Sequence, residues 1–235
     1  MEGLRTMTGL VDTTEMYVRT VYELEEEGIE PIRARICERL DLRGTSVRQT
    51  VDRLVGRDLL ILHDDRRLSL TDNGRLLAVR VMRKHRLAER LLIDVVGLPL
   101  EAAHAEACRW EHVMSERVER RLVTLLGNPA DSPFGAPIPG LRELGVDAEE
   151  RNFLDGVRRL TTATHRATDR LTLTVRRISE QPQQDTRLIG QLIDAGILPG
   201  REILATRRDN HVVVAAGGHE LRLTLKVAQH IFVAA

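Results

Sequence analysis

The fold is decided by the stretch Thr45-Ser-Val-Arg-Gln-Thr-Val-Asp-Arg-Leu-Val-Gly-Arg-Asp-Leu-Leu-Ile-Leu-His-Asp-Asp-Arg-Arg-Leu-Ser-Leu-Thr71. Val47, Val51 and Leu54 recur at helical spacing, so a helix is predicted from Thr45 or Ser46 to about residue 56. The apolar run 59–62, a turn-rich tetrad and the alternating run 67–71 then predict a β-hairpin. A helix followed directly by a hairpin is the second half of a winged helix-turn-helix.

The residues upstream complete that pattern. A helix is predicted over 11–27, with Asp12 and the threonines after it as capping candidates. Gly28 ends it, a short helix follows over 32–40, and 41–44 is a tight turn. The helix after this turn is expected to enter a major groove, and Arg66 at the hairpin tip to reach the same DNA. A helical adaptor that binds only protein is the alternative, but exposed Arg and Gln on the predicted third helix favour DNA.

The rest of the chain divides into helical and strand-like parts. Helices are predicted over 74–96, 100–114 and 115–126, and residues 128–140 form an extended loop. Five strand-like segments with turn signals between them predict a small β-barrel: 171–178, 201–206, 211–215, 221–225 and 230–234. The expected organisation is a mainly α chain with β structure, comprising 1–79, 80–146, a linker over 147–170 that is partly helical, and 171–235.

Composition narrows the functional class only in part. The chain has 35 basic and 35 acidic residues, so overall charge does not favour nucleic-acid binding. Residues 32–57 are locally basic, with seven arginines against three acids. With no signal peptide and no apolar run of about 20 residues, we expect a cytoplasmic protein without a membrane span. Of the two cysteines, Cys37 fits a small core residue, and Cys108 needs another explanation.

Side chains that can bind a metal ion are concentrated between residues 85 and 112. Cys108, Glu111 and His112 stand at spacing i, i+3, i+4, and His104 lies one turn earlier, so on one helix all four share a face. His85 and Glu89 repeat the i, i+4 spacing on the preceding predicted helix. A lone histidine on an amphipathic helix is usually structural, but this many ligand types on two consecutive helices predict a metal site. Mixed S, N and O ligands suit Fe²⁺, Co²⁺, Ni²⁺ or Zn²⁺ and disfavour Mg²⁺ and Ca²⁺.

An enzyme is the competing interpretation of this motif. Cys108-x-x-Glu111-His112 differs in one position from the inverted zinc-peptidase motif, in which Glu111 would be a general base. Two helices between a DNA-binding unit and a small barrel offer no substrate cleft of plausible size, so we expect no enzymatic activity.

Several segments resemble the diphtheria-toxin-repressor family of iron-dependent regulators, of the DtxR/IdeR type. They are Leu10-Val-Asp-Thr-Thr-Glu-Met16-Tyr, Arg33-Ala-Arg35, Val81-Met-Arg-Lys-His85-Arg-Leu-Ala-Glu89, Glu106-Ala-Cys108-Arg-Trp-Glu111-His112 and Ser132-Pro-Phe-Gly-Ala-Pro-Ile-Pro-Gly140. The resemblance implies a winged-helix domain, a helical dimerisation and metal domain, and an SH3-like C-terminal domain. It also implies a homodimer, with two dimers on one operator as a further possibility, that represses metal-uptake genes when Fe²⁺ is bound.

The same resemblance implies two metal sites per subunit. The activating set is Met16, Cys108, Glu111 and His112. The ancillary set is His85, Glu89, His104, Glu180 and Gln183. Pairing Met with Cys resembles the iron-responsive branch of the family, although Co²⁺, Ni²⁺, Mn²⁺ or Zn²⁺ could substitute. A regulator that responds to Mn²⁺, Co²⁺ or Zn²⁺ through a divergent operator is the alternative function.

The predicted recognition helix departs from the family pattern. Where the family has Ser-Gly-Pro-Thr-Val-Ser-Gln, this chain has Arg43-Gly-Thr45-Ser46-Val-Arg48-Gln49. Gln49 keeps the base-reading amide, while loss of the proline removes an expected contact with a thymine methyl. We expect operator DNA to be contacted by Thr13, Arg33, Arg35, Arg43, Thr45, Ser46, Arg48, Gln49, Arg53 and Arg66.

Overall fold

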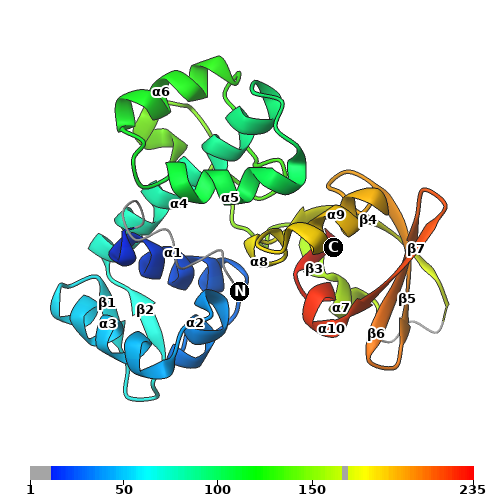
Figure 1. Cartoon of the computed structure of the whole chain (residues 1–235), viewed down its shortest axis with the longest axis horizontal. Coiled ribbons are helices and arrows are strands. Elements are labelled where there is room, and N and C mark those ends of the chain that lie inside the picture. Colours follow the sequence, from blue (N-terminus) through cyan, green and yellow to red (C-terminus); the bar gives the residue numbers. More distant parts are fainter. Residues whose placement is uncertain (1–11, 166–168) are drawn as a thin grey trace.

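The computed structural model describes residues 12–165 and 169–235, which form three units in Figure 1. The first unit begins with α1 (Thr13–Glu26), whose first turn is capped by Asp12 Oδ1 accepting from the Thr14 and Glu15 backbone N–H groups at 2.7 and 3.3 Å. Capping by an aspartate satisfies amides that have no partner within the helix. The first residue of the helix predicted over 11–27 lies outside the described residues.

The winged helix-turn-helix is confirmed. It consists of α2 (Arg33–Leu40), α3 (Gly44–Gly56), β1 (Leu60–Leu62) and β2 (Leu68–Leu70). The helix α3 begins one or two residues earlier than predicted, with Arg43 as its N-cap. The two strands pair antiparallel, and Arg66 at the tip has φ 69°, a conformation that such a tight turn demands. Buried apolar residues of α1, α2 and α3 form one core beneath the hairpin.

The second unit is helical. The long helix α4 (Asp72–Asp94) starts in the first unit, capped by Thr71, and continues into the second, where it packs against α5 (Leu100–Trp110) and α6 (Glu116–Leu125). The short 3-10 helix η1 (Leu141–Leu144) closes this unit's core. The helix predicted over 100–114 ends at Trp110 instead, because the chain must turn before Ser115, whose extended backbone is the N-cap of α6.

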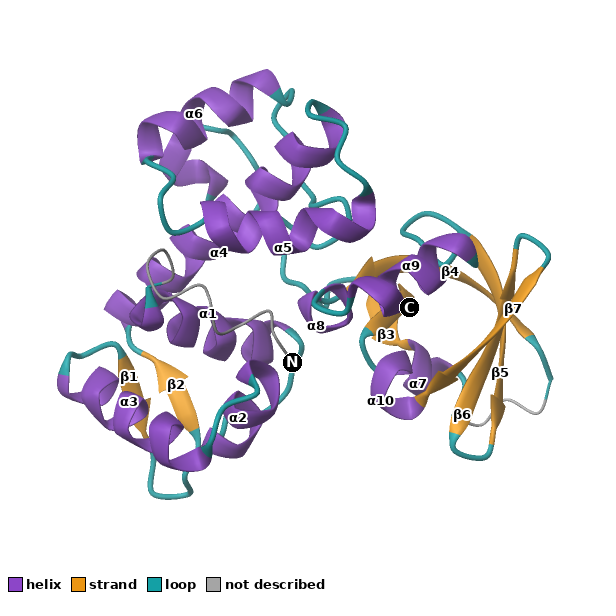
Figure 2. Ribbon diagram, in the orientation of Figure 1, coloured by secondary structure: helices purple, strands orange, loops and turns teal. Residues whose placement is uncertain are grey.

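The third unit is dominated by β-structure, which Figure 2 shows in orange. In the described residues its sheet has six strands in the order β3-β8-β4-β5-β6-β7. They are β3 (Val157–Arg159), β4 (Leu171–Ile178), β5 (Glu202–Arg208), β6 (His211–Ala216), β7 (His219–Thr224) and β8 (Ile231–Ala234). Residues 157–159 thus join this sheet, although they lie in the stretch expected to be a linker.

The sheet is not a closed barrel, which corrects the sequence-based expectation. The edge strands β3 and β7 are not hydrogen-bonded to each other within residues 12–165 and 169–235. Two short helices, α7 (Leu160–Ala163) on β3 and α10 (Leu225–Ala228) on β7, pack against each other between those edges. They cover the edges that barrel closure would otherwise remove.

The third unit contacts the other two. The helices α8 (Glu180–Gln183) and α9 (Thr186–Asp194) pack against α5. His230 Nδ1 lies 2.9 Å from Glu27 Oε2 just beyond α1, and Arg159 donates to the Glu27 carbonyl. The C-terminal unit is therefore held against both the DNA-binding unit and α5. In the described part of the chain, no helix combines the length and apolarity needed to cross a membrane.

Candidate metal centre

The packing of α4 on α5 brings most of the ancillary set together. His85 Nε2 lies 2.9 Å from Glu89 Oε1 and 3.2 Å from His104 Nδ1. His85 and Glu89 are one turn apart on α4, and all three side chains are almost completely buried. One ligand atom from each of these residues and from Glu180 lies within 4.8 Å of the others. The side chains predicted from two helices and a distant C-terminal segment therefore do meet.

Unpaired oxygens show that this arrangement fits a cation. Glu89 Oε2 and Gln183 Oε1 are buried and find no hydrogen-bond partner among residues 12–165 and 169–235. The amide nitrogen of Gln183 donates to Glu180 Oε2 at 3.0 Å and to two backbone carbonyls. A buried acceptor without a donor costs about 1–3 kcal/mol, which a coordinated metal ion would offset. The donor set of imidazole, carboxylate and amide oxygen suits a divalent transition metal.

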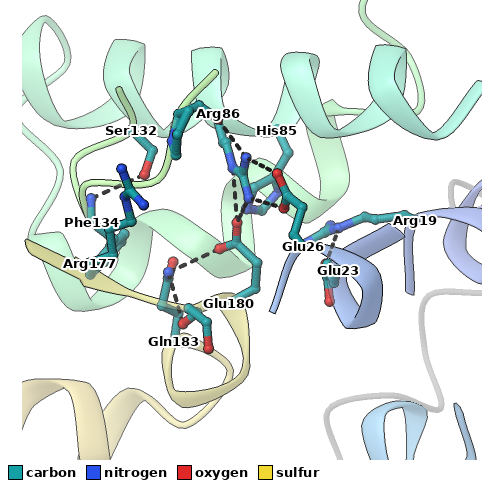
Figure 3. A network of polar contacts seen from close by, with 12 residues as sticks. Arg19, Glu23, Glu26, His85, Arg86, Ser132, Phe134, Arg177, Glu180 and Gln183 are labelled. Atoms are coloured by element: carbon teal, nitrogen blue, oxygen red, sulfur yellow. Dashed lines mark hydrogen bonds and ion pairs between the residues drawn. The ribbon is translucent and has the colours of Figure 1, made fainter. Parts of the chain in front are cut away.

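Glu180 is held in place by an arginine that the sequence reasoning missed. Figure 3 shows Arg86 of α4 between Glu180 of α8 and Glu26 of α1. Arg86 donates to Glu180 Oε1 at 2.9 and 3.1 Å, to Glu26 at 2.7 and 3.0 Å, and to the Pro137 carbonyl at 2.6 Å. Burial alone would lower the pKa of Arg86, but the two carboxylates raise it well above its ordinary value. A charged Arg86 therefore joins all three units beside the ancillary set.

The activating set is arranged differently. Glu111 is the C-cap of α5 and His112 lies in the following turn, so the expectation of one helical face for residues 104–112 holds only as far as Trp110. Glu111 Oε1 and His112 Nε2 are 3.4 Å apart. Met16 lies on α1, where its half-buried side chain packs against the core of the DNA-binding unit. The four predicted ligands thus come from two units that face each other.

Two residues of α1 occupy the space between those units. Arg19 Nη1 donates to Glu111 Oε2 at 2.5 Å and lies 3.5 Å from Cys108 Sγ, while Glu15 Oε2 is 2.6 Å from His112 Nδ1. The sequence analysis identified neither residue. Glu15 comes one residue before Met16 and Arg19 three residues after it, so both lie on the same side of α1 as that predicted ligand. This spacing is the signal that could have identified them.

Direct contacts join the two sets into one network. His85 Nδ1 lies 2.7 Å from Glu111 Oε2, and His104 Nε2 lies 3.5 Å from Cys108 Sγ. His85, His104 and Cys108 also present ligand atoms within 4.8 Å of one another. Each histidine therefore faces the ancillary set with one ring nitrogen and the activating set with the other.

The network holds unusual protonation states. Burial alone would raise the pKa of the Cys108 thiol, but His104 and Arg19 hold it well below its usual range. Burial acts against the charged form of His104, yet Cys108 and Glu89 raise its pKa to about 9. Burial is likewise outweighed at Glu111, whose pKa Arg19 and His85 lower to about 2. The contacts therefore favour a thiolate at Cys108 and a protonated imidazole at His104, and a metal ion that binds through that imidazole must displace its proton.

Most of the residues expected to contact DNA are exposed on the winged-helix unit. On α3 the buried Val47, Val51 and Leu54 point to the core, so the predicted contact residues of that helix face solvent. The exposed ones are Thr13, Arg35, Arg43, Thr45, Ser46, Arg48, Gln49, Arg53 and Arg66. Arg33 differs, being half-buried and paired with Asp52 at 2.5 Å.

Three family models match consecutive parts of the chain. Residues 9–68 match the iron dependent repressor N-terminal DNA binding domain, and residues 71–140 match the iron dependent repressor metal binding and dimerisation domain. Residues 169–235 match the FeoA domain. The three models follow the same order as the three units of the structure.

Whole-length relatives agree with these matches. The iron-dependent repressor IdeR of Mycobacterium tuberculosis is 55% identical over 215 residues, 91% of this chain and 93% of that protein. The diphtheria toxin repressor of Corynebacterium diphtheriae is 48% identical over 225 residues, 96% and 98% respectively. Among solved structures, T. acidophilum IdeR superposes with a TM-score of 0.74 at 26% identity, covering 95% of this chain and 98% of that one. A manganese-dependent transcriptional repressor with manganese gives 0.76 at 26%, covering 94% and 99%.

Proposed function

Because this chain belongs to the iron-dependent repressor family, we propose that it is an Fe²⁺-activated repressor that binds operator DNA as a homodimer and controls genes of iron uptake and metal homeostasis. The observation that carries this proposal is the buried contact between α1 of the DNA-binding unit and the end of α5. Arg19 and Glu15 meet Glu111, Cys108 and His112 there. Any ligand that binds among these groups must act on both units at once.

The residues around the contact define what each set would hold. The activating set would bind metal through the Met16 thioether, the Cys108 thiolate, Glu111 and His112. The ancillary set would bind a second ion through His85, Glu89, His104, Glu180 and Gln183, two of which carry the unpaired oxygens. Bound metal supplies positive charge that the ionised thiolate and carboxylates attract. The protein's own part is to hold those groups apart from water and in the ionised state.

The donor atoms favour iron over manganese. A thiolate and a thioether are soft ligands, whereas Mn²⁺ prefers carboxylate, carbonyl and water oxygens. Co²⁺, Ni²⁺ and Zn²⁺ also suit a mixed set and would substitute in vitro. A Mn²⁺-responsive regulator is the second candidate, because structures such as the manganese-dependent repressor share this fold.

DNA binding would proceed through α3 and the hairpin. Gln49 would read a base edge, while the arginines at 43 and 48, both exposed, would contact phosphate or guanine. Added phosphate contacts steepen the dependence of affinity on salt. We therefore propose an operator preference that differs from the common family operator, with a steeper salt slope.

Exposed apolar side chains support the dimer. They lie near the ends of α4 and α5 and at the start of α6: Val95, Val96, Trp110, Val113 and Val118, exposed by 36–62%. Valines and a tryptophan exposed this far on neighbouring elements are typical of an interaction surface. Two dimers on one operator would follow if operator half-sites repeat. Since its target is operator DNA, the working protein would lie in the cytoplasm.

The family is not an enzyme class, and we propose no catalytic activity. As a peptidase, the chain would need Glu111 as a free general base, but the proposed function assigns that carboxylate to the metal, and His85 Nδ1 lies 2.7 Å from it. Hydrolysis of a peptide or ester by the zinc-loaded protein would contradict this.

The test is binding to a genomic fragment library under anaerobic conditions, with and without Fe²⁺. Fragments upstream of metal-uptake genes should be retained only when Fe²⁺ is present, and Cys108→Ser should lose that response. Retention that is indifferent to Fe²⁺, or stronger with Mn²⁺ than with Fe²⁺, would overturn the iron-activated proposal.

A further inference from the structure

Arg19 is the one permanent cation within the activating set in the described structure. Its side chain is 8% exposed, and its guanidinium contacts Glu111 and Cys108 of the second unit and Glu23 of its own helix. Glu111 and Cys108 are two of the four groups that the proposed function assigns to the activating metal. The guanidinium therefore lies where a bound cation would lie.

The other cations in the network differ from Arg19 in one respect. His85 and His104 can lose their protons when metal arrives and then act as neutral ligands. A guanidinium does not lose its proton in proteins and has no lone pair to offer. Arg19 can therefore yield to a metal only by moving.

We infer that Arg19 is the displaceable counter-ion of the activating set and sets the metal concentration at which that set fills. The inference rests on the proposed function, because it concerns the same ligands. Arg19 and the metal compete because the guanidinium lies 2.5 Å from Glu111 and 3.5 Å from Cys108, and a divalent ion bound to the same two groups would be held against a second buried cation that repels it.

Glu23 provides a place for the displaced side chain. Arg19 Nε donates to Glu23 Oε1 at 2.7 Å, one turn along α1 (Figure 3). This pair lies within one helix, so it survives when the guanidinium leaves Glu111. The charge then keeps a buried partner, and displacement costs less than full exposure of an unpaired ion.

The exchange also changes how α1 is attached to α5. Without metal, the ion pair of Arg19 with Glu111 joins the two helices. With metal, the link would pass through Met16, three residues earlier, or about 4.5 Å along the helix axis. Replacing one attachment by the other shifts the DNA-binding unit relative to the metal unit, which is a two-state element that metal biases.

The test is a Co²⁺ titration of the full-length protein without oxygen, followed by the thiolate-to-cobalt absorption that reports on Cys108. A neighbouring opposite charge changes the affinity of a carboxylate for a proton by tenfold or more, and we expect Arg19→Gln to lower the half-saturating Co²⁺ concentration by about tenfold. Its metal-free form should also melt at a lower temperature. Arg19→Lys keeps the charge, so its Co²⁺ midpoint should stay much closer to that of the wild type.

Arg83→Gln is the matched control, because Arg83 is an equally buried arginine whose partners, Glu119 and Glu143, lie outside both sets. It should lose stability with an unchanged Co²⁺ midpoint. A midpoint for Arg19→Gln equal to or higher than that of the wild type would overturn the inference. If this variant does not fold, the Nη–H resonances of wild-type Arg19, which report on the contact with Glu111, are followed by NMR as Zn²⁺ is added, and signals unchanged at saturation would overturn the inference.

These outcomes are separable from failure of the proposed function. If wild-type protein binds operator independently of metal, the proposed function fails, whatever the Co²⁺ midpoints are. If wild-type operator binding requires metal but Arg19→Gln has a wild-type midpoint, only the role of Arg19 fails.

Discussion

The two ligand sets lie side by side but differ in how they are assembled. The ancillary set is built mainly from α4 and α5, whose buried side chains already face one another at 2.9–3.4 Å. The activating set spans α1, the end of α5 and the turn after it, and Arg19 and Glu15 lie among its members. In the preassembled set the side chains already face one another, whereas a metal in the divided set would connect side chains of two units. The second arrangement is the one suited to a switch.

The largest effect is expected from the removal of Arg86, which fixes Glu180 beside the ancillary set. Arg86→Met leaves Glu26 and Glu180 buried without their cation, and breaking a buried pair from one side costs about 3–5 kcal/mol of the free energy of unfolding. Urea unfolding measures the loss. Arg90→Met is the control, because Arg90 is half-buried and its loss should cost about 1 kcal/mol or less. Equal losses in the two variants would show that Arg86 does not organise this set.

Removal of the Met16 side chain should weaken metal binding at the activating set and leave the ancillary ligands in place. Met16→Ala should abolish metal-dependent DNA binding without preventing folding, since the affinity of the activating set falls by up to about a hundredfold, or about 2.7 kcal/mol. Operator binding against Fe²⁺ concentration and urea unfolding together measure this. Unchanged operator affinity would refute the assignment of Met16. A His104→Gln variant, altered in the ancillary set, should weaken the response less.

A third prediction concerns the docking of the C-terminal unit, away from both sets. Burial alone would raise the pKa of Glu27, but His230 and Arg39 hold it below its ordinary value. A carboxyl with a lowered native pKa adds stability above the unfolded pKa of about 4.3 and loses it as pH falls below that value. Glu27→Gln should therefore cost about 2 kcal/mol at pH 7, and this difference from wild type should fade on acidification.

Urea unfolding between pH 7 and pH 3 measures that difference. Glu25→Gln on the same helix is the control, because Glu25 pairs with the half-exposed Arg75 and should cost about 1 kcal/mol or less. A Glu27→Gln difference that stays constant down to pH 3 would argue against an ionised Glu27 as the source.

The smallest effect that we expect is on metal affinity, when the N-terminal cap of α1 is removed. Asp12→Ala removes the cap of α1 and costs about 1 kcal/mol, loosening the turn that carries Glu15 and Met16. Metal affinity should fall by up to about fivefold at the activating set and remain unchanged at the ancillary set. Thr224→Ala removes a comparable cap from α10, remote from both sets, and should lower stability without changing metal affinity. A Co²⁺ titration that shows equal changes in both variants would contradict the prediction.

Much of the fold could be predicted because its signals are local. The spacing of Val47, Val51 and Leu54 specifies α3, and Asp12 and Thr71 mark the starts of α1 and α4. The open sheet could not be predicted, because five strand-like segments look alike whether their edges pair or are covered. The three residues of β3 are also too short a segment to show periodicity.

For the candidate site, the types of ligand could be predicted from the sequence, but the charged residues around them could not. Histidine, cysteine and glutamate at helical spacing indicated metal chemistry, and the family resemblance divided the ligands into two sets. Arg19, Glu15 and Arg86 escaped notice because charged residues on an amphipathic helix usually face solvent. Only the packing of α1 on α4, with the end of α5 nearby, buries Arg19 and Arg86 and partly buries Glu15.

The amino-acid sequence was enough to predict the winged helix and the two helices that carry the candidate metal ligands, since each depends on periodicity within about a dozen residues. The tertiary structure alone decided which residues share the buried space between α1 and α5. Burial there places Arg19 against Glu111 and Cys108 and lets charges that water would screen act on one another at 2.5–3.5 Å. The candidate ligands could therefore be found from short stretches of sequence. Their connection to the DNA-binding unit depends on contacts between residues about 90 positions apart.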